Sequence, residues 1–82
     1  MQRWYFSTRA GRLYTEAAFS RGDVLVFGKE TKGLPQSLLD IDPQRALRIP
    51  QRRAAVRSIN LSTAAGIGVY AALAQLGFPG ML

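Results

Sequence analysis

The sequence contains no cysteine and no histidine. This excludes a disulfide framework, a thiolate or imidazole zinc site, a cysteine nucleophile and a Ser-His-Asp triad within the chain. We expect no metal ion. The absence of cysteine also fits a reducing compartment, so a cytoplasmic location is expected.

No apolar run in the sequence is long enough to cross a membrane. The best candidate, Ala64–Ala74, has 11 residues and ends at Gln75, whereas a spanning helix needs about 20 residues. The amino terminus also lacks the apolar core of about 7–15 residues that marks a signal peptide. We therefore expect neither a membrane span nor a secretory leader.

Acidic residues are scarce, and the charge is unevenly placed. Eleven Lys and Arg stand against five Asp and Glu, for a net charge of +6. Every charged residue lies between Arg3 and Arg57, and the segment from Ser58 to Leu82 carries none. The basic part favours a polyanionic partner, most often nucleic acid. The alternative is a solvated basic surface that keeps a small domain soluble.

The 82 residues, 48% of them apolar, suit one small globular domain or part of one. We expect strands at 3–8, 24–27 and 46–49, a short helix at 35–40, and either a strand or a helical turn within 13–19. A long helix is predicted from about residue 60 to about residue 76, with Gly77 as its C-cap and Pro79 beyond it. This order predicts an α/β fold with a parallel sheet.

The long helix is rich in alanine and glycine and is apolar on nearly all sides. One stripe of the helix is formed by Leu61, Ala64, Ala65, Gly68, Ala72 and Leu76, and other apolar residues occupy much of the remaining surface. A helix of this kind is typically buried, either inside a domain or between subunits.

Ligands of parallel α/β sheets bind beyond the carboxyl ends of the strands. Here those ends carry Ser7-Thr8, Gly28–Gly33 and Pro50–Ser58. The second loop has the glycines of the first half of a Walker A loop, but Leu34-Pro35 stand where lysine and a hydroxyl are needed. Since G-x-G-x-x-G is also absent, we expect neither a nucleoside triphosphate nor NAD in this loop.

Two groups of polar residues in these loops could serve a site. Glu30 either pairs with a neighbouring lysine at the surface, or orients a cationic group at the strand end. Ser58, Asn60 and Ser62 could each be a helix N-cap, but together they exceed what one cap needs. These side chains could face the same crevice as Glu30.

Three segments in order, Phe27–Pro35, Arg48–Pro50 and Arg57–Ser62, resemble the second and third motifs of the SPOUT methyltransferases, in the SpoU/TrmH branch. The closing Gln75–Gly80 is similar to the end of the compact tRNA (cytidine/uridine-34)-2′-O-methyltransferases. The resemblance covers essentially the whole chain.

The resemblance implies a parallel α/β SPOUT fold with a carboxyl-terminal trefoil knot, and an obligate homodimer. It also implies S-adenosylmethionine-dependent methylation of a ribose 2′-hydroxyl in RNA, at the wobble position of tRNA. Carried over by position, the cofactor contacts would be Phe6, Gly28, Ile49 and Ser58, largely through the backbone. Glu30, Ser58 and Asn60 would line the catalytic centre.

The chain departs from this family in one major respect. Family members carry an amino-terminal half of similar size, whose first motif holds an Asn and a catalytic Arg, and nothing before Arg3 supplies it. Residues 1–82 are therefore expected to be the carboxyl-terminal half of a single SPOUT domain, either a piece of a longer protein or a truncated reading frame. The alternative is a non-catalytic RNA-binding or dimerisation module that retains the knot region.

Overall fold

The computed structural model describes residues 1–28, 33–50 and 61–81. Four strands form one sheet, namely β1 (Arg3–Phe6), β2 (Arg12–Leu13), β3 (Val24–Phe27) and β4 (Ala46–Arg48). They lie in the order β2-β4-β1-β3, and every neighbouring pair is parallel. The predicted α/β architecture with a parallel sheet is confirmed.

Strand β1 occupies the middle of the sheet and fixes the register of its neighbours. Its last residue, Phe6, lies opposite Phe27 of β3 on one side and Leu47 of β4 on the other. Because all three strands run in the same direction, their carboxyl ends reach the same edge of the sheet.

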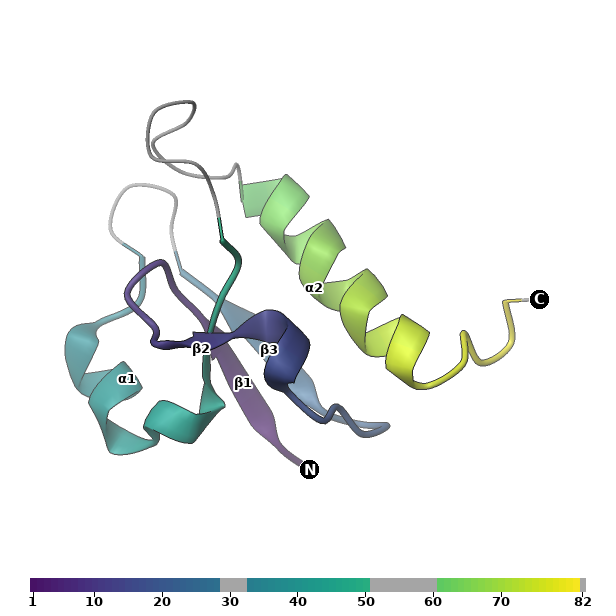
Figure 1. The fold of residues 1–82 in the computed structure, drawn as a ribbon, viewed down its shortest axis with the longest axis horizontal. Helices are drawn as coiled ribbons and strands as arrows, with labels where there is room; N and C mark the ends of the chain where they lie inside the picture. Colours follow the sequence, from purple (N-terminus) through teal and green to yellow (C-terminus); the bar gives the residue numbers. More distant parts are fainter. Residues whose placement is uncertain (29–32, 51–60, 82) are drawn as a thin grey trace.

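Two α-helices cover opposite faces of this sheet, α1 (Gln36–Ile41) on one and α2 (Leu61–Gln75) on the other (Figure 1). Two short 3-10 helices, η1 (Tyr14–Glu16) and η2 (Pro43–Arg45), precede β3 and β4. The segment 13–19 was predicted as a strand or a helical turn. It contains both, because Leu13 is the last residue of β2 and η1 follows directly.

The hydrophobic core has two parts, one on each face, as the alternation of side chains along a strand requires. On the α2 face, Trp4, Phe6 and Leu47 pack together with Ala17 and Phe19. On the α1 face, a smaller cluster comprises Ala10, Leu34, Leu39 and Ala46, with Tyr5 and Val26 against it.

Helix α2 packs closely on the sheet at Gly68, the one buried residue of this helix. A methyl group at this position would lie 3.0 Å from Phe27 Cζ and 3.1 Å from Phe6 Cζ. The two phenyl rings stack with their centroids 4.6 Å apart. The predicted stripe of small residues therefore packs, at Gly68, on the stacked rings of Phe6 and Phe27, which we call the aromatic platform.

The outer face of α2 differs from the prediction of a helix buried on all sides. In this single chain Val69 is 43% exposed and Tyr70 is 58% exposed. The prediction allowed for a covering subunit, and coverage of this face by a second copy stays a prediction.

The end of α2 confirms the C-cap predicted at Gly77, which has φ +79°. The N–H of Gly77 donates to the carbonyl of Ala74 at 3.2 Å, and the N–H of Phe78 donates to that of Leu73 at 2.8 Å. This pair of bonds defines a Schellman motif, with glycine in the left-handed position that other residues disfavour.

The connection from β4 to α2 runs through residues 51–60, which lie outside the described part of the chain. The trefoil crossing therefore stays a prediction. Within residues 1–28, 33–50 and 61–81, none of the helices combines the length and the apolar character that crossing a bilayer requires.

Candidate functional site

The carboxyl edge of the sheet brings together three residues that the sequence assigned to a cofactor. Phe6 ends β1, Gly28 directly follows β3, and Ile49 directly follows β4. Since β1 lies between β3 and β4, these three positions are neighbours. The other predicted site residues, Glu30, Ser58 and Asn60, lie outside the described residues.

Phe6 can offer a ligand only its backbone. Its side chain is 7% exposed and is stacked on Phe27 beneath α2. Ile49 also packs its side chain against this part of the core. Cofactor contacts through the main chain at these positions stay a prediction.

Gly28 has a different neighbour from the one that the sequence suggested. We expected a ligand to approach its backbone, but a Cβ on Gly28 would lie 2.2 Å from the carbonyl carbon of Gly33 and 2.5 Å from the nitrogen of Leu34. Real Cβ contacts are never this short. Glycine is therefore required at position 28 because the backbone of Gly33 and Leu34 occupies the space that a side chain would need.

Gly33 lies at the other side of this close approach and has φ +66°. A Cβ there would meet nothing within 4 Å, so the demand at Gly33 is conformational rather than spatial. Glycine is thus required at the two ends of this loop for different reasons, which are lack of space at Gly28 and a positive φ at Gly33.

The turn after β1 supplies a side chain that sequence reasoning missed. The guanidinium of Arg9 donates a hydrogen bond from Nη2 to the carbonyl oxygen of Leu34, 25 residues along the chain. The N–H of Arg9 donates to Ser7 Oγ at 3.1 Å, which holds the turn. No local pattern marks this arginine, because its partner is a backbone atom of a distant segment.

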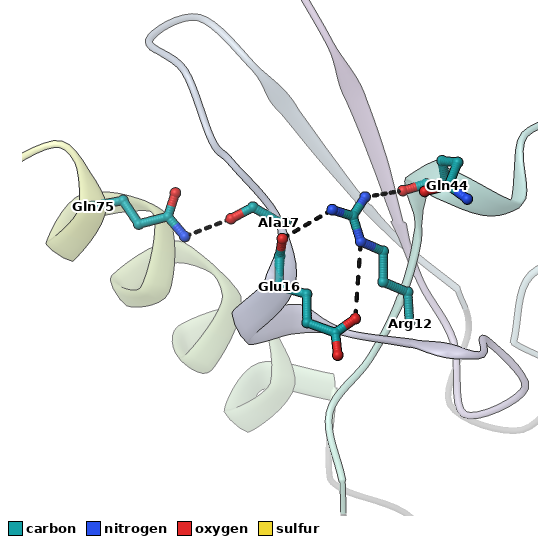
Figure 2. A network of polar contacts seen from close by, with 5 residues as sticks. All are labelled: Arg12, Glu16, Ala17, Gln44 and Gln75. Atoms are coloured by element: carbon teal, nitrogen blue, oxygen red, sulfur yellow. Dashed lines mark hydrogen bonds and ion pairs between the residues drawn. The ribbon is translucent and has the colours of Figure 1, made fainter.

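A second polar network joins β2 to the two 3-10 helices (Figure 2). Arg12 donates to the carbonyl of Gln44 at 2.7 Å and to that of Glu16 at 2.9 Å. Its Nε lies 4.0 Å from a carboxylate oxygen of Glu16. These bonds link η1 to η2 and give the edge strand β2 a fixed position.

Asp23 organises the amino-terminal side of the sheet, just before β3. Its carboxylate accepts hydrogen bonds from Trp4 Nε1 and from the backbone N–H groups of Gln2 and Ser20, each at 2.9 Å. The bond from Trp4 contributes most to lowering the pKa of Asp23, with the two backbone bonds adding to it and burial opposing it. Asp23 therefore favours the charged form and has a structural role.

Among the residues that the structure describes, no three acidic side chains gather into a group that could hold a metal ion. What the described part of the carboxyl edge offers is backbone groups at three neighbouring strand ends. Backbone N–H and C=O groups are among the polar groups that fix organic ligands in protein sites.

The fold defines a class of protein, the parallel α/β domains, in which ligands bind beyond the carboxyl ends of the strands. Comparison with known proteins makes the class specific. Residues 1–70 match the SpoU rRNA Methylase family, and the chain belongs to that family. Membership of a methylase family implies a methyl donor.

Two relatives show which branch the chain is similar to. A tRNA (cytidine(34)-2′-O)-methyltransferase of Saccharophagus degradans is 46% identical over 78 residues, covering 94% of this chain and 50% of the relative. The protein of the same name from Escherichia coli (strain K12) is 43% identical over 75 residues, covering 90% and 47%.

Two solved structures are similar to this chain in fold as well as in sequence. A chain from Bacillus anthracis superposes with a TM-score of 0.86 at 34% identity, covering 96% of this chain and 51% of that one. A structure concerned with 2-OH methylation of C/U34 on tRNA gives a TM-score of 0.82 at 41% identity, covering 93% and 48%. The chain thus spans about half the length of the relatives it matches.

Proposed function

We propose that residues 1–82 form the cofactor-binding, carboxyl-terminal half of a SPOUT methyltransferase domain that uses S-adenosylmethionine to methylate a ribose 2′-hydroxyl in RNA. The substrate we propose is tRNA at its wobble nucleotide. The observation that carries the proposal is the gathering of Phe6, Gly28 and Ile49 at one edge of the sheet. The names of the relatives support the reaction.

The described residues fit the proposed cofactor. The ladder between β1 and β3 ends at Phe6 and Phe27, whose rings stack on each other. Main-chain groups at the strand ends can hydrogen-bond the adenine and ribose. S-adenosylmethionine would supply an electrophilic methyl group on a sulfonium.

The polar residues assigned by resemblance complete the proposed centre. Methyl transfer to a hydroxyl depends mainly on orientation, and the hydroxyl must lose a proton to a nearby base. We propose that Glu30, Ser58 and Asn60 line this centre, with Ser58 also contacting the cofactor. The basic residues would hold the RNA backbone without reading its sequence.

The remaining parts of the proposal concern assembly and location. A homodimer would cover the exposed outer face of α2, where Val69 and Tyr70 lie. We place the protein in the cytoplasm, with tRNA as its macromolecular substrate and no resident metal.

The test measures transfer of labelled methyl from S-adenosylmethionine to unmodified tRNA, with tRNA already 2′-O-methylated at nucleotide 34 as the control. The 82-residue chain is compared with a version extended upstream by the family's first half. We expect cofactor binding but background transfer from the shorter chain. Loss of a general base typically costs about 10²–10⁴-fold in rate, and a misplacement of about 1 Å can cost roughly another 10²-fold.

Other outcomes separate the alternatives. Equal turnover by both versions would mean that this chain supplies the activating group, with Arg57 the first residue to replace. Binding of tRNA with no affinity for S-adenosylmethionine in either version would overturn the enzyme proposal in favour of the non-catalytic RNA-binding or dimerisation module.

A further inference from the structure

Arg9 connects two segments that border the candidate site. It lies in the turn that follows β1, and its guanidinium donates to the carbonyl oxygen of Leu34, just before α1. The two residues are 25 positions apart. This bond therefore joins the end of one strand to the backbone that returns from the end of its neighbour, β3.

Both partners of this bond are firmly held. On one side, Ser7 accepts the N–H of Arg9 at its hydroxyl and the N–H of Ala10 at its carbonyl, while its own N–H donates to Leu47 of β4 at 2.9 Å. On the other side, the Leu34 side chain is 7% exposed and packs with Ala10. Because each segment is held by its own contacts, the bond between Arg9 and Leu34 fixes the position of one segment relative to the other.

The position that Arg9 fixes is the one that Gly28 needs. The backbone of Gly33 and Leu34 passes so close to Gly28 that no side chain fits between them. Holding Leu34 by its carbonyl keeps this close approach in place at the carboxyl end of β3. The distance between Gly28 and this backbone is therefore controlled by Arg9, which belongs to the turn after β1 and not to β3.

We propose that Arg9 is a positioning residue for the methyl-donor site. Its guanidinium holds the Leu34 backbone and so fixes the edge to which Gly28 belongs, without touching the donor. The structural part of this proposal concerns the chain alone, whereas the effect on ligand binding rests on the proposed function. Arginine suits this role because its planar fork loses little freedom per hydrogen bond formed.

The first experiment needs no ligand. Amide hydrogen exchange is followed at Gly33 and Leu34 and, as a reference, at Trp4–Phe6 of β1, in the wild-type chain and in Arg9→Met. Loss of a hydrogen bond from a charged donor should raise local exchange about tenfold. Exchange in β1 should stay unchanged, which distinguishes local loosening from global unfolding.

The second experiment measures the affinity of S-adenosylmethionine and of S-adenosylhomocysteine by calorimetry. If Arg9 acts only by positioning, Arg9→Met should weaken both ligands equally, by about tenfold, because the bond it removes touches neither. Arg9→Lys should recover most of the loss, since an ammonium can still donate to one carbonyl.

Two control variants exclude simpler explanations. Arg21→Met removes the same charge from an exposed turn just before β3, at the opposite end of that strand from Gly28, and both affinities should stay at the wild-type level. Gly77→Ala destabilises the end of α2, far along the chain, and should lower stability without changing either affinity at a temperature where the chain is folded.

Specific results would overturn the proposal. Unchanged exchange at Gly33 and Leu34 in Arg9→Met would show that the bond holds nothing. Faster exchange at Gly33 and Leu34 in Arg9→Met, with unchanged affinities for both ligands, would show that Arg9 has no role in binding the methyl donor. A gain of affinity for S-adenosylmethionine alone would overturn the positioning role, because it would show that the arginine charge acts directly by repelling the sulfonium. The affinities are measured in the wild-type chain and in the version extended upstream. If neither version binds either ligand, the proposed function fails together with the donor part of this proposal, whereas exchange still decides the structural part.

Discussion

The side chain of Gln75 is hydrogen-bonded to the backbone of Phe19, 56 positions earlier in the chain. Its carboxamide oxygen accepts the N–H of Phe19 at 2.8 Å, and its carboxamide nitrogen donates to the carbonyl of Ala17 at 2.7 Å. Figure 2 shows the second of these bonds. One side chain thus satisfies two backbone groups and ties the last turn of α2 to the segment after η1.

Replacing Gln75 by leucine should destabilise the chain by about 1–3 kcal/mol, because a part-buried donor and a part-buried acceptor both lose their partner. Urea unfolding measures the change. The matched control is Gln36→Ala, which removes an exposed bond to Asp40 within one helix and should cost only about 0.2–0.5 kcal/mol. Equal losses for the two variants would mean that the Gln75 bonds contribute no more than a surface pair.

The sequence predicted the elements of this fold well because their signals are local. Apolar runs between turns marked β3 and β4, and glycine followed by proline marked the end of α2. It could not predict the bonds from Gln75 and Arg9, since each reaches a backbone group 25 or more positions away. Backbone partners leave no trace in residue type, so only the folded chain reveals them.

The candidate site divides in the same way. The resemblance assigned Phe6, Gly28 and Ile49 to the cofactor, and the predicted parallel sheet placed them at one edge because parallel strands run in the same direction. The reason for Gly28 could not be foreseen. Its closest neighbour is the backbone of Gly33, and that approach depends on how the chain returns from β3 to α1.

Two glycines in α2 should respond to alanine with opposite signs. At Gly68 the new methyl would lie 3.0 Å from the ring of Phe27, and overpacking of this kind costs about 1–3 kcal/mol. At Gly66 it would meet nothing within 4 Å, and an alanine in a helix interior is favoured over glycine by about 0.5–1 kcal/mol. Urea unfolding of both variants checks the pair; stabilisation by Gly68→Ala would show that α2 is not seated on the aromatic platform.

Stability should fall in acid through Asp23. Its pKa is lowered, chiefly by the hydrogen bond from Trp4, so the folded state binds the proton less readily than the unfolded chain, where an aspartate has a pKa of about 3.9. The stabilisation is therefore present above that value and is lost as the pH falls through the lower pKa of the folded state. Urea midpoints followed by Trp4 fluorescence between neutral and acid pH measure it, and Asp23→Asn should flatten this part of the profile. A variant as acid-sensitive as the wild type would assign the effect to other carboxylates.

Gly28→Ala tests which neighbour makes glycine necessary at the end of β3. The new Cβ would lie 2.2 Å from backbone that cannot rotate away as a side chain could, so Gly33 and Leu34 must shift. We expect a loss of about 1–3 kcal/mol in stability and at least a tenfold loss of S-adenosylmethionine affinity, which urea unfolding and calorimetry measure.

Two neighbouring glycines serve as controls for Gly28→Ala. Gly11→Ala adds a methyl group in open space and should change stability by less than about 0.5 kcal/mol. Gly33→Ala also meets no atom within 4 Å but must adopt φ +66°, which costs roughly 1–2 kcal/mol. If Gly28→Ala keeps full stability yet loses the cofactor, a ligand and not the chain itself approaches Gly28, and the explanation from the fold is wrong. If both properties fall together, the backbone at Gly33 is the neighbour that excludes a side chain, and the shape of the donor site depends on how that backbone is held.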